Sequence, residues 1–121
     1  MVAEISVTEL QSVLDDDEPV RIVDIRSPTA FRRGHIPGSE NIPFPQLTTG
    51  VADLAGADHV VTVCPHGHDS VRAANIILSY EGIDDARVES LAGGLTAWDG
   101  QVETGESSRS SDEAGDDTAP F

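Results

Sequence analysis

The stretch VVTVCPHGHDSVRAANII, residues 60–77, decides the fold of this chain. It opens with four β-branched residues at positions 60–63, and an apolar run without alternation indicates a strand of a parallel sheet that is covered on both faces. The only cysteine of the chain, Cys64, stands directly after this strand. Ligands of open α/β sheets bind outside the carboxyl ends of the strands, so Cys64 lies where a functional residue is expected.

A short loop and a helix follow the cysteine. Pro65 and Gly67 favour a tight turn, and Ser70 is expected to cap the helix. The predicted apolar stripe of this helix, which is expected to end at Gly82, comprises Val71, Ala74, Ile77 and Leu78. Backbone N–H groups and the positive end of the helix dipole favour a thiolate, which makes Cys64 a candidate nucleophile. The other interpretation is that Cys64 is a small buried hydrophobic residue.

Strand and helix patterns alternate on either side of this stretch. Further strands are expected at residues 3–6, 20–25, 40–42 and 86–91. Further helices are expected at residues 7–14, 29–33 and 45–55 and in a short segment that begins near Gly93 and Gly94 and carries Trp98. Ser6 and Glu9 have the spacing of a capping box. The alternation predicts a doubly wound parallel α/β domain.

Length and composition indicate one domain followed by a tail. A chain of 121 residues supplies a single hydrophobic core, which we assign to residues 1–100. Residues 101–121 are rich in acids and serines, which predicts a disordered tail. One cysteine permits no internal disulfide, and we find neither a signal peptide nor a membrane span. We therefore expect a cytoplasmic protein.

The charge of the chain is strongly acidic. The formal net charge is -15, and all seven basic residues are arginine. This composition fits either a partner with a basic surface or a hydrated surface suited to a salt-rich cytosol, where ions screen the repulsion between carboxylates. The spread of the acids along the chain favours the second interpretation. No basic stripe for binding nucleic acid is present.

Three motifs resemble the sequence of a known family. DIRSPTAFRRGHIPGSENIP at residues 24–43, CPHGHDS at 64–70 and LAGGLTAW at 91–98 resemble the flanking signatures and the active-site loop of a single-domain rhodanese. The resemblance covers roughly residues 5–100. It implies an α/β fold in which a five-stranded parallel sheet is flanked by helices on both faces, and it implies no cofactor.

The resemblance also implies a reaction. A sulfane sulfur, commonly from thiosulfate, is transferred to cyanide or a thiol acceptor through a persulfide on the catalytic residue Cys64. The loop that would cradle the persulfide or the donor anion comprises Pro65, His66, Gly67, His68, Asp69 and Ser70. Many loops of the family carry an arginine or a lysine, and this one does not. The residues that could supply the positive charge are Arg72, Arg26 and Arg32.

Three other functions stay open at this point. A cysteine phosphatase has a similar loop, but Ser70 stands where that loop carries an arginine. A metal site would use Cys64, His66 and His68 with His59, although structural zinc usually takes its ligands from two separated pairs, so we expect no metal. A sulfur carrier or docking module would form the same persulfide and pass its sulfur to a partner protein.

Three residues in the flanking motifs have structural interpretations. His35 is expected to satisfy backbone groups in a tight turn. Trp98 is expected to pack against the flank of the sheet. Asp24 and Arg26 form a possible ion pair that fixes the turn after their strand.

Overall fold

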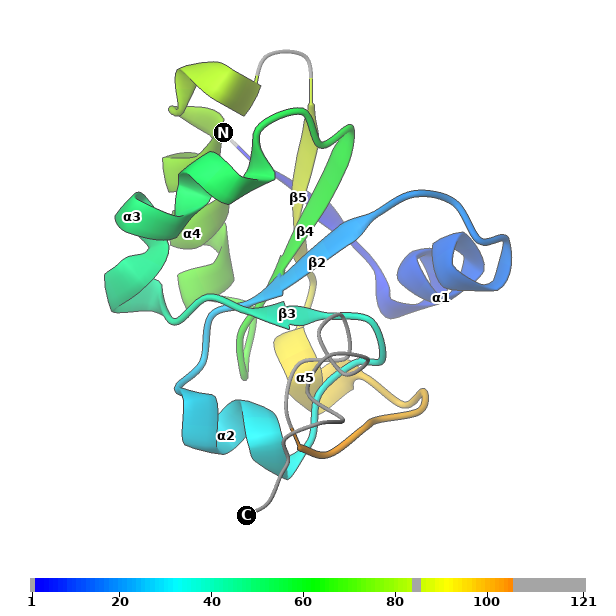
Figure 1. The fold of residues 1–121 in the computed structure, drawn as a ribbon. Helices are drawn as coiled ribbons and strands as arrows, with labels where there is room; N and C mark the ends of the chain where they lie inside the picture. The colour runs from blue at the N-terminus through cyan, green and yellow to red at the C-terminus, as the bar shows by residue number, and fades with distance from the viewer. Residues whose placement is uncertain (1, 84–85, 106–121) are drawn as a thin grey trace, which may run out of the picture.

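The computed structural model describes residues 2–83 and 86–105 of the chain. Five strands form one sheet in the order β1-β5-β4-β2-β3, and every neighbouring pair is parallel (Figure 1). The strands are β1 (Ala3–Ile5), β2 (Arg21–Asp24), β3 (Glu40–Asn41), β4 (His59–Val63) and β5 (Arg87–Leu91). The predicted five-stranded parallel sheet is confirmed, with each strand end within about one residue of its expected position.

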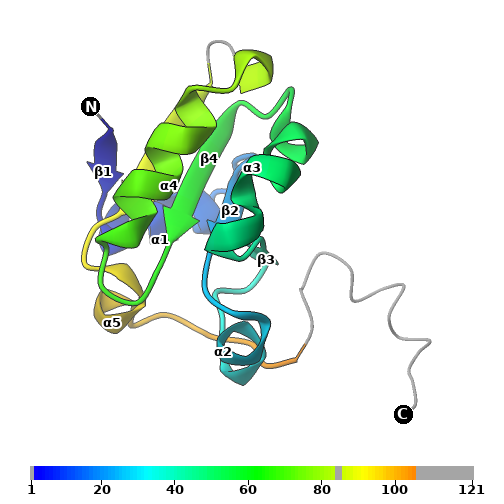
Figure 2. The same ribbon diagram turned by 90° about the vertical axis from the view of Figure 1, so that its left-hand side faces the viewer.

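Helices cover both faces of the sheet. Helices α3 (Leu47–Gly50) and α4 (Asp69–Leu78) lie on one face, and α1 (Val7–Asp15) lies on the other (Figure 2). The short helices α2 (Pro28–Arg33) and α5 (Gly94–Ala97) lie at the end of the sheet toward which β4 points. Within residues 2–83 and 86–105, no helix is long and apolar enough to span a bilayer.

Two clusters of apolar side chains hold these layers together. Val23 and Val60 belong to the cluster that also contains residues of α3 and α4. Their neighbours Ile22 and Val61 belong to the cluster that contains Leu10 of α1. Successive residues of a strand point to opposite faces, so β2 and β4 are buried on both sides. This double burial explains why β4 carries a β-branched run without alternation and why Ile22 and Val23 of β2 are adjacent apolar residues.

The first helix begins as the sequence predicts. The hydroxyl of Ser6 accepts a hydrogen bond from the backbone N–H of Glu9 at 3.0 Å, and the Glu9 carboxylate accepts one from the N–H of Ser6 at 3.1 Å. This is the predicted capping box. Leu10 is fully buried, and Val7 and Leu14 pack against the same cluster.

The prediction for α4 is wrong in its start and its end. The helix begins at Asp69 with His68 as its N-cap, so Ser70 lies inside the helix and does not cap it. The helix ends at Leu78 instead of Gly82, and Leu78 is 42% exposed. The inward face also differs from the predicted stripe, because the buried residues of the helix are Ser70, Ala73, Ala74 and Ile77.

The predicted helix at residues 45–55 is also wrong in detail. The structure has three short segments there, η1 (Phe44–Gln46), α3 and η2 (Val51–Leu54), where η marks a 3-10 helix. Gly50 interrupts the segment, and it packs so closely that an added Cβ would lie 3.0 Å from Cγ2 of Ile42. A glycine among β-branched residues disfavours one continuous α-helix.

The chain after residue 100 returns to the body of the domain. Glu103 and His35 exchange two backbone hydrogen bonds of 2.8 Å each, and the N–H of Gly105 donates to the carbonyl of Arg32 at 2.8 Å. Hydrogen bonds to the domain therefore continue past the predicted boundary at residue 100. Residues 106–121 lie outside the described residues, so the disordered tail stays a prediction.

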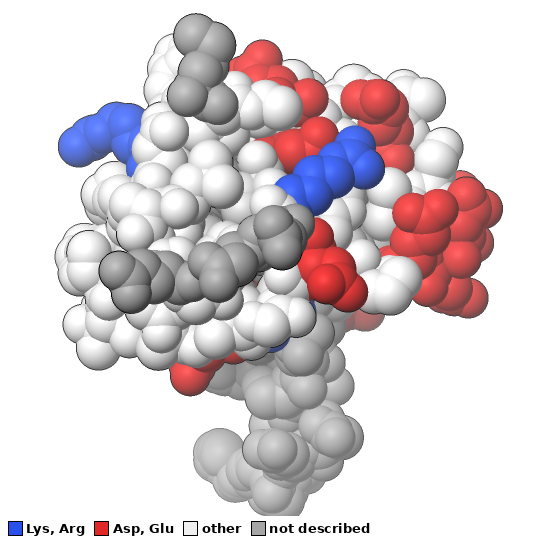
Figure 3. Space-filling view, turned by 90° about the horizontal axis from the view of Figure 1, so that it is seen from above, with Lys and Arg blue, Asp and Glu red and all other residues white. Residues whose placement is uncertain are grey.

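Acidic side chains gather on the surface seen from above in Figure 3. The run of acids at residues 15–18, at the end of α1, is exposed at all four positions. This exposure agrees with a solvated surface.

We expect the unfolding temperature to rise strongly between dilute buffer and molar KCl, because salt screens the repulsion among the carboxylates. Thermal unfolding followed by circular dichroism over a series of KCl concentrations measures this effect. Sucrose at equal osmolality is the control, since it stabilises proteins by exclusion and screens no charge. A midpoint that stays constant in KCl would contradict the salt-adapted interpretation.

Candidate active site

Cys64 lies at the carboxyl end of β4, and its side chain is 3% exposed. Residues 65–68 connect it to α4, and α5 packs against this connection. The N–H of Leu95 donates to the carbonyl of Cys64 at 2.9 Å, and the N–H of Thr96 donates to the carbonyl of Pro65 at 3.0 Å. Two helices therefore hold the loop at the end of the sheet where ligands of α/β proteins bind.

Three polar groups surround the sulfur atom. The N–H groups of Gly67 and Ser70 donate to Cys64 Sγ at 3.0 and 3.3 Å, and the hydroxyl oxygen of Ser70 lies 3.3 Å from it. Burial raises the pKa of the Cys64 thiol, but the Ser70 hydroxyl and the N–H groups of Ser70, Gly67 and His66 together lower the pKa below its ordinary value. The loop therefore favours the thiolate.

Glycines allow the loop and α5 to meet. Gly67 has φ +89° and Gly94 has φ +64°, both in the left-handed region that favours glycine. A Cβ at Gly94 would overlap the carbonyl oxygen of Cys64 and lie 2.6 Å from the nitrogen of Gly67. The second glycine of the third motif is therefore required by a close approach of two backbones.

The predicted loop residues fall into two groups. Gly67 and Ser70 are buried, and their N–H groups contact the sulfur. The others are exposed: Pro65, His66, His68 and Asp69. The direct contacts to Cys64 thus come from the backbone and from one hydroxyl, and a substrate-binding role for the exposed side chains stays a prediction.

His59, the fourth candidate ligand of the metal-site alternative, lies away from the loop. His59 is at the opposite end of β4 from Cys64, and its Nε2 lies 2.7 Å from Glu89 Oε1. His59 therefore cannot join Cys64, His66 and His68 around one ion. Across residues 2–83 and 86–105, no group of three or more potential ligands is arranged to hold a metal ion.

Arg26 is held in a buried ion pair. Its Nε and Nη2 lie 2.9 and 2.7 Å from the two carboxylate oxygens of Asp24, and Nη2 also donates to the carbonyl of Gly34 at 2.7 Å. The Asp24 side chain is 1% exposed. These contacts fix the turn after β2, which is the structural interpretation given above.

The other two candidate arginines are exposed. The Arg72 guanidinium lies 5.2 Å from the centre of the Phe44 ring and 3.5 Å from an Asp69 oxygen, and its side chain is 72% exposed. It stands in the first turn of α4, directly after the cysteine loop. Arg32 is exposed on α2. Arg72 and Arg32 can therefore meet a ligand from solution.

His35 has the structural role that its motif suggested. The side chain is fully buried, Nδ1 lies 2.8 Å from the carbonyl oxygen of Phe31, and the two rings stack at 3.8 Å. A buried ring bonded to a helical carbonyl supports the turn after α2.

Two buried hydroxyls next to the loop were not among the predicted site residues. Ser90 Oγ lies 2.6 Å from Ser70 Oγ, and Thr62 Oγ1 donates to the carbonyl of Ser70 at 2.7 Å. Both Ser90 and Thr62 are fully buried. The available signal was a polar residue at an inward position of an apolar strand, because such a residue needs a hydrogen-bond partner.

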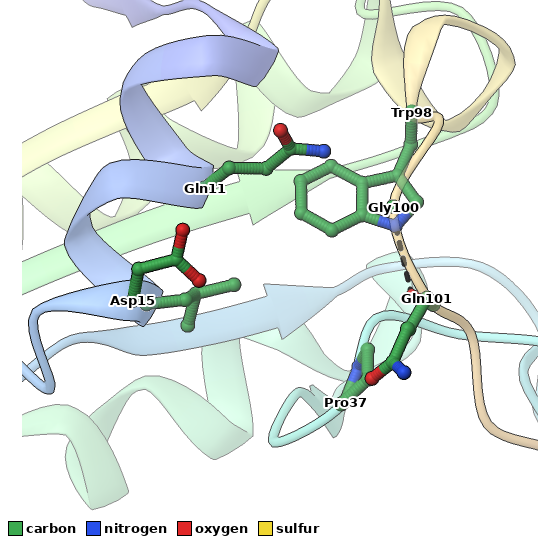
Figure 4. A pocket seen from close by; sticks show the side chains of 7 residues that line it. Gln11, Asp15, Pro37, Trp98, Gly100 and Gln101 are labelled. Atoms are coloured by element: carbon green, nitrogen blue, oxygen red, sulfur yellow. Dashed lines mark hydrogen bonds between the residues drawn. The ribbon is translucent and has the colours of Figure 1, made fainter.

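A separate pocket of about 380 Å³ lies beside α1 (Figure 4). Its walls come from Gln11, Leu14, Asp15, Pro37, Trp98, Gly100 and Gln101. Trp98 packs against the core cluster on the α1 face, as predicted, and its Nε1 donates to the carbonyl of Gln101 at 3.0 Å. None of the cysteine-loop residues lines this pocket.

The fold and the site together define an α/β domain built around a hydrogen-bonded cysteine loop. The model of the rhodanese-like domain family matches residues 6–101. The chain therefore belongs to the rhodanese-like domain family, as its three motifs predicted.

Relatives and solved structures agree with this assignment. The thiosulfate sulfurtransferase GlpE of Pseudoalteromonas translucida is 35% identical over 95 residues, which cover 78% of this chain and 87% of the relative. The putative sulfur carrier protein YrkF of Bacillus subtilis is 28% identical over 102 residues, which cover 84% of this chain and 54% of that protein. A human single-domain sulfurtransferase shares the fold, with a TM-score of 0.69, 24% identity and coverage of 81% of this chain and 96% of the other.

Proposed function

We propose that this protein is a sulfurtransferase that carries sulfane sulfur as a persulfide on Cys64. The observation that carries this proposal is the set of N–H and O–H groups of Gly67 and Ser70 around Sγ. Such groups favour the thiolate, which is the nucleophilic form of a cysteine. The relatives named thiosulfate sulfurtransferase and putative sulfur carrier protein support sulfur transfer as the reaction.

The proposed reaction has two half-reactions, with thiosulfate as the donor. The Cys64 thiolate attacks the outer sulfur of thiosulfate, the S–S bond of the donor breaks, and sulfite leaves with the bonding electron pair. Cyanide or a thiolate then attacks the outer sulfur of the persulfide and releases Cys64 as a thiolate. Backbone N–H groups of the loop stabilise the negative charge on sulfur in both steps.

The positive charge that attracts the donor is assigned to Arg72. Its guanidinium is exposed in the first turn of α4, whereas that of Arg26 is held by Asp24 and the carbonyl of Gly34. Arg32 is the second candidate, because its side chain is exposed on α2. An arginine binds an oxyanion through several N–H donors, which suits the sulfonate end of thiosulfate.

Intact mass spectrometry after incubation with thiosulfate in molar KCl tests the proposed function. We expect the wild type to gain one sulfur atom and Cys64→Ser to gain none. The lowered pKa of Cys64 keeps the thiolate populated below the ordinary thiol range, so loading should fall only as the pH drops through that lowered pKa. A wild type that gains no sulfur at any pH above this pKa would contradict the proposal.

A sulfur carrier is the second candidate function, because the relative YrkF is named a putative sulfur carrier protein. A carrier and an enzyme form the same persulfide and differ in the acceptor. The rate of sulfur release from the loaded protein to cyanide and to glutathione separates them. If sulfur release to both small acceptors is slower than loading by thiosulfate, the result favours a carrier that delivers its sulfur to a protein.

The proposed setting is a reducing cytoplasm. Cys64 must return to a free thiolate after each turnover, and reducing compartments keep thiols free. The acidic surface further suggests a salt-rich interior.

A further inference from the structure

Ser70 and Ser90 form a pair of hydroxyls behind the reactive sulfur. Their Oγ atoms are 2.6 Å apart, and both side chains are fully buried. Ser70 comes from the first turn of α4 and Ser90 from β5, the neighbour of β4 in the sheet (Figure 1). Ser70 Oγ is also 3.3 Å from Cys64 Sγ. The three side chains therefore form a hydrogen-bond chain that runs from the sulfur of Cys64 through the hydroxyl of Ser70 to that of Ser90.

Counting protons fixes the direction of these hydrogen bonds. A serine hydroxyl has one proton to donate, and a thiolate can only accept. When Cys64 is a thiolate, the proton of Ser70 points to Sγ, so the short contact between the serines needs the proton of Ser90. When Cys64 is a neutral thiol, its S–H can donate to Ser70, and Ser70 can then donate to Ser90. The direction in which these hydrogen bonds donate thus depends on whether the sulfur is ionised.

We infer that Ser90 is a positioning residue that turns the Ser70 hydroxyl toward the sulfur of Cys64 by donating its own proton to Ser70 Oγ. A hydroxyl that accepts a hydrogen bond becomes a better donor, because neighbouring bonds polarise one another. Ser90 therefore strengthens the bond that stabilises the thiolate without touching the sulfur. This inference deepens the proposed function, since it concerns how the reactive form of Cys64 is maintained.

The surrounding sheet supports this role. Thr62 and Ser90 are partners in the register of β4 and β5, and Thr62 Oγ1 donates to the backbone carbonyl of Ser70. One strand thus holds the backbone of Ser70 and the other contacts its hydroxyl. Among the described residues, Ser70 is the hydrogen-bond partner of the Ser90 side chain.

Glu89, the residue before Ser90, is buried, but successive strand residues point to opposite faces of the sheet, and its carboxylate lies 2.7 Å from His59 Nε2. The titratable groups on the side of Ser70 and Ser90 lie in solvent. On the loop and α4 these are His66, His68 and Asp69, which are exposed and donate no side-chain hydrogen bond to Sγ. On β1, Glu4 is the register partner of Ser90 and is also exposed. These groups are the same in every variant compared below.

The pH dependence of Cys64 alkylation by iodoacetamide tests the inference. Cys64 is the only cysteine, so the signal belongs to this residue. Ser90→Ala should raise the midpoint of the rate profile and lower the rate below the midpoint by roughly two- to tenfold, the value of one hydrogen bond. Ser70→Ala should raise the midpoint further. Ser79→Ala, which removes a hydroxyl bonded to Ile76 at the far end of α4, should leave it unchanged.

The double variant Ser70→Ala with Ser90→Ala distinguishes a positioning role from a structural one. Because Ser90 acts through Ser70, the double variant should have the midpoint of Ser70→Ala alone. If Ser90→Ala does not fold, the pair Ser90→Thr and Ser90→Val replaces it. The two introduced side chains have nearly the same shape, and only that of Ser90→Thr keeps a hydroxyl. The inference would be overturned if the midpoint of Ser90→Ala equalled that of the wild type. It would also be overturned if the midpoint of Ser90→Val equalled that of Ser90→Thr. The titration needs no sulfur donor, so it can fail or succeed independently of persulfide formation.

Discussion

Gly94→Ala is expected to lower the free energy of unfolding by about 4 kcal/mol or more and to displace the Cys64 loop. Gly94 is buried with φ +64°, and an added Cβ would overlap the carbonyl oxygen of Cys64. The same Cβ would lie 2.6 Å from the nitrogen of Gly67 and from the carbonyl carbon of Pro65. All three atoms belong to the backbone, so no side-chain rotation can relieve the overlap.

Gly56→Ala is the matched control for this prediction. Gly56 also has a positive φ, +85°, but nothing lies within 4 Å of an added Cβ, so this variant tests backbone strain alone. We expect it to cost about 1–2 kcal/mol. Urea unfolding of both variants measures the difference, and alkylation of Cys64 in the folded fraction reports on the loop. Equal losses of stability in the two variants would show that the backbone contact of Gly94 is not tight.

The strands and the position of Cys64 at the edge of the sheet follow from local patterns in the sequence. An apolar run without alternation predicts β4, because this strand is buried on both faces. A cysteine after such a run, followed by proline, glycine and a helix, predicts a loop at the carboxyl edge of the sheet. These patterns involve residues that are close in sequence, so no long-range pairing is needed to read them.

The roles of the serines depend on contacts between distant residues. Ser70 resembles a cap in the sequence, but it lies inside the helix, and its hydroxyl contacts Cys64 and Ser90. Ser90 is twenty residues further along the chain, and only the order of the strands brings it to Ser70. The interruption of the predicted helix at Gly50 has a local signal, a glycine among β-branched residues, whereas the close contact of Gly50 with Ile42 depends on the fold.

The arginine of the first motif illustrates a choice that sequence alone left open. Asp24 and Arg26 suited either an ion pair or a site for the donor anion. The described contacts of Arg26 are two carboxylate oxygens and one backbone carbonyl, so its charge is already balanced in the absence of substrate. The geometry therefore favours a structural role for Arg26, in contrast to the anion-binding role proposed for Arg72.

Arg26→Met is expected to lower the free energy of unfolding by about 3–5 kcal/mol, because it leaves the carboxylate of Asp24 buried without its cation. The Asp24 side chain is 1% exposed. It would lose its hydrogen bonds from the Arg26 side chain and keep the one from the backbone N–H of residue 26, which is 3.0 Å long. Adding Asp24→Asn to Arg26→Met should restore part of the stability, since it removes the unpaired charge. Urea unfolding of the single and double variants measures both effects.

Arg72→Ala is the contrasting variant. Its ion pair with Asp69 spans 3.5 Å, and both side chains are largely exposed, so its loss should change stability by no more than about 1 kcal/mol. If Arg72 binds the donor anion, the same variant should raise the Michaelis constant for thiosulfate several-fold. An unchanged Michaelis constant would exclude Arg72 and leave Arg32 as the candidate. A stable Arg26→Met variant with a raised Michaelis constant would instead give the anion-binding role to Arg26, because an arginine that holds only the turn affects substrate binding through stability alone.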